Sequence, residues 1–163
     1  ALLTTLATAS GFEVDQKYID AFFEDGLVAI PDVLSEADVA AIEVEYDRCM
    51  NNEVPGLMER MGKDFTDMSK PFGTAFEDFS VVNFMLPHRY HPPLRGNAFE
   101  KVAASIAAQV FPGVEMVQDY DQLLDKRPSK SDAVFAMHQD MAYWPPAEMT
   151  ANDTRTVTVT LAL

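Results

Sequence analysis

The sequence predicts an α+β domain, with helices in its first two thirds and strands in its last third. Three segments before residue 110 combine an N-cap residue with the apolar period of a helix. From residue 114 onward, apolar residues alternate at a period of two, as they do in strands. At 163 residues and 48% hydrophobic content, the chain fits one globular domain. We therefore expect a single domain with a sheet-based core.

The first helix is expected to begin after Asp15, whose carboxylate can cap free amide groups, and to run through Phe23. Gly26 supplies the stop, because glycine tolerates the left-handed conformation found after many helices. A short apolar strand is expected at 27–30. Pro31 would close it, since proline lacks the amide hydrogen that a ladder needs.

Two further helices follow the same rules. One is expected from the cap Ser35 to about Met50, and the other from the cap Asn97 to about Val110. Between them, residues 51–96 show no regular pattern, so 1–110 is expected to be mainly helical and irregular. The methionines and phenylalanines of 51–96 indicate a segment that lies over a core. It fits either an active-site lid or a packed loop without ligand contact.

Strands are expected in the last third of the chain. Residues 114–124 alternate, 126–132 form a polar turn, and 133–140 return as a strand. After a proline-containing loop, 155–163 is a strand by its β-branched content. These segments would form the sheet of the domain.

The charge and the cysteine content limit the kinds of partner and metal site that the protein can have. The formal charge is -14, from 26 acidic and 12 basic residues, which would repel a polyphosphate backbone. No run approaches the roughly 20 apolar residues that span a bilayer. Cys49 is the only cysteine, so neither an internal disulfide nor a cysteine-based zinc site is possible. We expect a cytoplasmic protein that binds a small molecule, without nucleic acid or membrane partners; the sequence indicates no particular oligomeric state.

The triplet His138-Gln139-Asp140 is the main candidate for chemistry. If the preceding residues form a strand, its period of two places His138 and Asp140 on the same face. An imidazole and a carboxylate are two of the three ligands in the 2-His-1-carboxylate triad of Fe(II) oxygenases. The alternative is a surface strand end that carries two polar residues.

Three segments in order resemble the phytanoyl-CoA dioxygenase family of Fe(II)- and 2-oxoglutarate-dependent oxygenases. They are 22–35, 123–128 and 135–145, the last of which contains the triplet. The resemblance implies a double-stranded β-helix, the jelly roll of cupin-like proteins, with the N-terminal helices packed outside it. Residues 114–163 would then hold the first strands of this jelly roll.

The resemblance also implies the chemistry. A small organic substrate would be hydroxylated by O2 while 2-oxoglutarate is decarboxylated to succinate and CO2. His138 and Asp140 would be the catalytic iron ligands. The residues that would contact 2-oxoglutarate are Gln122, Gln139, Thr160 and Lys126, and those that would wall the substrate are Tyr143 and Trp144.

The family pattern continues beyond residue 163, where this chain stops. The distal histidine and the arginine that binds 2-oxoglutarate come later in the family, so we expect a C-terminally truncated fragment with an incomplete domain. His88 and His91 precede the triplet and are expected to be loop histidines between prolines. Two alternatives stay open: a non-catalytic binding or regulatory relative without a complete iron site, and a different metal, such as Zn(II), on His138 and Asp140.

Overall fold

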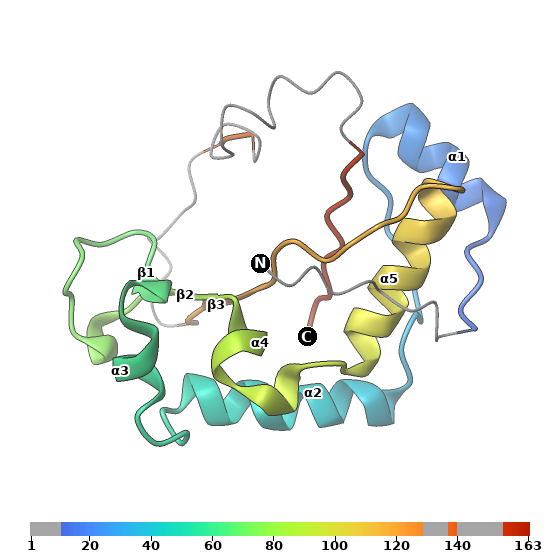
Figure 1. Ribbon diagram of the computed structural model, residues 1–163. Helices are drawn as coiled ribbons and strands as arrows, with labels where there is room; N and C mark the ends of the chain where they lie inside the picture. The colour runs from blue at the N-terminus through green and yellow to red at the C-terminus, as the bar shows by residue number, and fades with distance from the viewer. Residues whose placement is uncertain (1–10, 129–136, 140–154) are drawn as a thin grey trace.

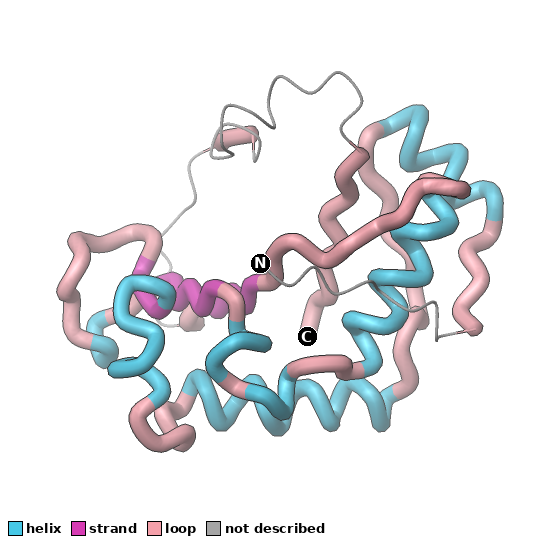
Figure 2. The backbone as a smooth tube through the Cα atoms, viewed as in Figure 1, coloured by secondary structure: helices cyan, strands magenta, loops and turns pink. Residues whose placement is uncertain are grey.

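The computed structural model describes residues 11–128, 137–139 and 155–163 (Figure 1). Their helices are α1 (Gln16–Asp25), α2 (Glu36–Met50), α3 (Leu57–Met61), α4 (Pro87–Tyr90) and α5 (Ala98–Val110). Their strands are β1 (Phe65–Asp67), β2 (Val81–Met85) and β3 (Gln122–Lys126), and short 3-10 turns lie at Gly62–Asp64, Phe76–Asp78 and Pro92–Leu94 (Figure 2). The mixture of helix and strand is confirmed, but two of these strands fall inside the segment expected to be irregular.

The caps of the predicted helices are where the sequence places them. The Asp15 carboxylate accepts a hydrogen bond from the Lys17 amide at 3.0 Å, and Gly26 ends α1 with φ of 79°. At α2, the Ser35 hydroxyl accepts from the Asp38 amide at 3.1 Å and donates to the Asp38 carboxylate at 2.6 Å. Local hydrogen bonds alone therefore fix where these helices begin.

The cap of α5 also matches its prediction. Asn97 Oδ1 accepts from the Glu100 amide at 2.9 Å. The Glu100 carboxylate turns back and accepts from the amide of Gly96, one residue before the cap. Glu100 is thus held in a fixed position in the first turn of the helix.

Three predicted strands are corrected by the structure. Residues 27–30 form none, and Leu27 is 74% exposed. Residues 155–163 likewise have no regular structure. In the third case β3 begins at Gln122 rather than at residue 114, and it includes Lys126, which was expected to open a turn. Alternation marks a possible face, but a strand forms only where a neighbour pairs with its backbone. The expected strand at 133–140 lies outside the described residues except for 137–139, which are not strand.

The described strands form one antiparallel sheet in the order β1-β2-β3. Phe65 pairs with Phe84, and Val82 pairs with Asp125. The face that carries Phe65, Val82 and Phe84 packs against the C-terminal end of α2 and against α3. This core cluster consists of Cys49, Met50, Val54, Leu57, Met61, Phe65, Phe79, Val82, Phe84 and Leu94.

A second cluster surrounds α5. Val102, Ile106 and Val110 are buried against apolar side chains from residues 12–34 and against Val159. Every buried hydrophobic residue of the described chain lies between Ile42 and Val110.

In the described part of the chain, no helix is both long enough and apolar enough to cross a bilayer.

Candidate functional site

Every second side chain of β3 is exposed. Because side chains alternate along a strand, Asn83 on β2 shares one face of the sheet with Gln122, Leu124 and Lys126 on β3. All three β3 side chains are exposed, whereas Asn83 is 1% exposed. Two of the residues predicted to bind 2-oxoglutarate, Gln122 and Lys126, therefore project from the same face of one strand.

Gln122 is held by a partner that sequence reasoning missed. Its side-chain amide donates to Oδ1 of Asn83, and the Asn83 amide lies 3.1 Å from the Met68 sulfur. The signal in the sequence was a single polar residue inside the apolar run 81–85. A buried amide within such a run needs hydrogen-bond partners, and here one partner is a predicted site residue.

The basic residues near the end of β3 behave differently from each other. Lys126 ends the strand with its side chain exposed. Arg127 instead lies over the Phe76 ring, 4.4 Å from its centre, and donates to the Phe76 carbonyl at 3.1 Å. Lys126 is thus the cation of this pair that faces solvent.

The remaining predicted site residues are only partly within the described chain. His138, Gln139 and Thr160 are all exposed, and Met137 beside them is 100% exposed. Asp140, Tyr143 and Trp144 lie outside the described residues. The arrangement of the predicted iron ligands relative to the predicted co-substrate residues therefore stays a prediction.

A second group of polar residues gathers around α4. The expectation that His88 lies in a loop is wrong: it belongs to α4, because Pro87 occupies the first helical position, where proline is tolerated. His88 Nδ1 is hydrogen-bonded to Asp121 Oδ1, and the His88 amide donates to Asp121 Oδ2 at 3.2 Å. Glu100 lies nearby, and the possible ligand atoms of all three residues fall within 4.8 Å of one another.

His91 is a buried partner of α2. It is 4% exposed, and its Nε2 lies 2.6 Å from Glu45 Oε2. The hydrogen bond to His91, followed by the charge of Arg48, lowers the pKa of Glu45 against the effect of burial. This pair ties α2 to the turn after α4, which is a structural role.

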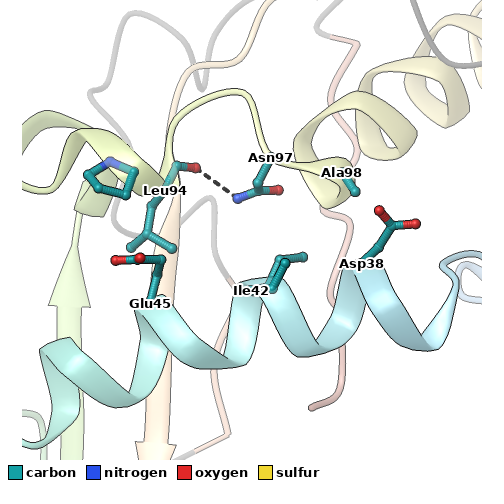
Figure 3. A pocket seen from close by; sticks show the side chains of 8 residues that line it. Asp38, Ile42, Glu45, Leu94, Asn97 and Ala98 are labelled. Atoms are coloured by element: carbon teal, nitrogen blue, oxygen red, sulfur yellow. Dashed lines mark hydrogen bonds between the residues drawn. The ribbon is translucent and has the colours of Figure 1, made fainter.

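A pocket of about 230 Å³ lies between α2 and the chain that leads into α5 (Figure 3). Its walls are Asp38, Ala41, Ile42, Glu45, Pro93, Leu94, Asn97 and Ala98. Asn97 Nδ2 donates to the Leu94 carbonyl at 2.8 Å and fixes the upper wall. None of the predicted site residues lines this pocket.

Comparison with known proteins identifies the class. A family model matches residues 22–163, a range that includes every predicted site residue, and it places the chain among oxygenases. The model is that of phytanoyl-CoA dioxygenase (PhyH), and the chain belongs to this family. The resemblance drawn from the three segments is thereby confirmed, and oxidoreductase activity follows at the level of the family. No curated protein and no solved structure gave a significant match.

Proposed function

We propose that this protein is an Fe(II)- and 2-oxoglutarate-dependent dioxygenase. It would hydroxylate a small organic substrate with O2 and convert 2-oxoglutarate to succinate and CO2. The observation that carries the proposal is the family match over 22–163, which spans the triplet His138-Gln139-Asp140. The charge of -14 supports a small-molecule substrate rather than a nucleic acid.

The donor set fits iron. His138 is exposed, and a neutral imidazole is a good ligand for Fe(II). With Asp140 it supplies one ligand of each type that the facial triad uses. These two residues would hold the metal, and the bound iron would supply the oxidising power for attack on a C–H bond.

The chain's own residues would bind and orient the co-substrate. The Lys126 ammonium, exposed at the end of β3, would pair with a carboxylate of 2-oxoglutarate. The Gln122 amide would donate its second N–H to the same molecule while the first stays bonded to Asn83. Thr160 and Gln139 would add a hydroxyl and an amide. Tyr143 and Trp144 would wall the substrate and exclude water.

This function implies a larger sheet. We propose that β1, β2 and β3 are early strands of a double-stranded β-helix, with α2 and α3 on its outer face. Gln122 and Lys126 would then point into the barrel, where a co-substrate sits. Residues 1–163 would form one domain of this architecture.

The test is anaerobic addition of Fe(II) and 2-oxoglutarate to the protein. We expect the weak visible charge-transfer band of a metal-chelated 2-oxoacid. His138→Ala should abolish the band, whereas Met137→Ala, at the neighbouring exposed position, should keep it. Absence of the band from the unmodified protein, or its survival in His138→Ala, would contradict the proposal.

A further inference from the structure

We propose that His88, Glu100 and Asp121 form a binding site for a divalent transition-metal ion, separate in its residues from His138 and Asp140. The three side chains come from α4, from the first turn of α5 and from the residue just before β3. Their candidate ligand atoms, one imidazole nitrogen and two carboxylate oxygens, all lie within 4.8 Å of one another.

Each ligand is fixed by its own backbone. Pro87 starts α4 and sets His88 in its first turn, while the cap at Asn97 and the bond to the Gly96 amide hold Glu100. The carbonyl of Asp121 accepts from the Leu86 amide at 2.9 Å, which joins this residue to the chain entering α4. Residues from α4, from α5 and from the chain just before β3 thus present their ligands to one point.

The charge at this point favours a cation. In the part of the chain that the structure describes, neither Glu100 nor Asp121 forms an ion pair with lysine or arginine. Arg95 donates to the His88 carbonyl at 3.4 Å rather than to a carboxylate.

The ligand types favour Zn(II) or a similar ion. Imidazole suits zinc and its first-row neighbours, and zinc also accepts carboxylate oxygen. Bonds of about 2.0–2.2 Å place tetrahedral ligands about 3.3–3.6 Å apart. The hydrogen-bonded atoms of His88 and Asp121 would therefore move apart to admit the ion, while Glu100 lies within 4.8 Å of both. The metal would replace the proton between His88 and Asp121, and a water would take the fourth position. It would then clamp α4, α5 and the start of β3 together.

The experiment titrates ZnCl2 into the His138→Ala protein, which lacks a predicted iron ligand, and measures bound zinc by equilibrium dialysis. We expect one equivalent to bind. Adding Glu100→Gln should weaken binding at least about tenfold, since loss of even an indirect ligand partner costs about 10–100-fold. Glu43→Gln makes the same change of charge at an exposed position on α2 and should leave the affinity unchanged.

Folding is checked in parallel by circular dichroism. Glutamine at position 100 keeps an oxygen that accepts from the Gly96 amide, so this variant should stay folded. His88→Gln provides a second variant, and it should lose zinc to a similar degree. The proposal is overturned if the His138→Ala protein binds no zinc, or if the position-100 and position-88 variants bind it as tightly as Glu43→Gln does.

Discussion

Gln122 on β3 donates its side-chain amide to Oδ1 of Asn83 on β2, so a residue predicted to contact 2-oxoglutarate is anchored to a buried polar residue of the sheet. The anchor limits the rotamers of Gln122 before any ligand arrives. Positioning of this kind is what a binding site on a rigid strand needs.

Removing that anchor should destabilise the fold. Asn83→Ala takes away the partner of Gln122. It also leaves a void at a buried position, because Asn83 is only 1% exposed. We expect the free energy of unfolding to fall by about 1–3 kcal/mol, measured by urea denaturation. Glu43→Gln on exposed α2 should change it by less than about 0.5 kcal/mol. Equal effects of the two substitutions would show that Asn83 contributes no more than a surface residue.

Asp67 should account for part of the acid sensitivity of the sheet. Its carboxylate accepts from the Ser69 amide at 2.6 Å, the Ser69 hydroxyl at 2.7 Å and the Ser80 amide at 2.5 Å. Burial raises the pKa of Asp67, but these hydrogen bonds outweigh burial and the net shift is downward. A lowered pKa means that the stabilisation is complete above the unfolded value of about 3.9 and is lost as pH falls through the folded value.

Asp67→Asn should therefore lower the free energy of unfolding by about 1–3 kcal/mol at neutral pH. The gap between the unmodified protein and the variant should narrow as pH falls below about 4, measured by urea denaturation at a series of pH values. Asp78→Asn, at a nearby exposed position, serves as the control. A gap that stays constant down to pH 3 would mean that ionised Asp67 is not the stabilising form.

The pair of His91 and Glu45 offers a matched comparison on one helix. Glu45→Ala removes the partner at 2.6 Å from the buried His91 ring, whereas Glu43→Ala lies two residues away on the exposed side of α2. We expect the first to lower the free energy of unfolding by about 1–3 kcal/mol more than the second, because a buried polar group loses its partner. Thermal unfolding of both variants measures this difference. A lower melting temperature for Glu43→Ala than for Glu45→Ala would show that the pair of His91 and Glu45 does not stabilise the fold.

Cys49 should be inert in the folded protein. It is 1% exposed, and burial together with the charge of Glu45 raises the pKa of its thiol to about 12. The reactive thiolate is therefore nearly absent at pH 8. A thiol reagent such as Ellman's reagent should label Cys49 quickly in urea and scarcely at all without it. Rapid labelling of the native protein would place Cys49 at the surface.

The sequence predicted the elements whose cause is local. Caps at Asp15, Ser35 and Asn97 depend on hydrogen bonds within a few residues, and all three form as expected. The expected helix from Asn97 to about Val110 also forms, and Val102, Ile106 and Val110, which recur at the helical period, are buried. Such features need no knowledge of distant parts of the chain.

The sheet could not be predicted in the same way. In β2 the first four residues, Val81 to Phe84, are all buried, so the period of two that marks a half-exposed strand is absent. Residues 114–121 show that period but belong to none of the described strands, because the partner of β3 begins pairing only at Gln122. The contacts of His88 with Asp121, 33 residues apart, also depend on tertiary packing that no local pattern reveals.

The location of the buried core between Ile42 and Val110 has a consequence for synthesis of the protein. The ribosome releases this region before β3 and before the triplet at His138, and domains begin to fold as they emerge. Helices α2, α3 and α5 can bury their apolar faces while the later segment is still being made. The predicted catalytic residues would then be added last, onto a scaffold that is already assembled.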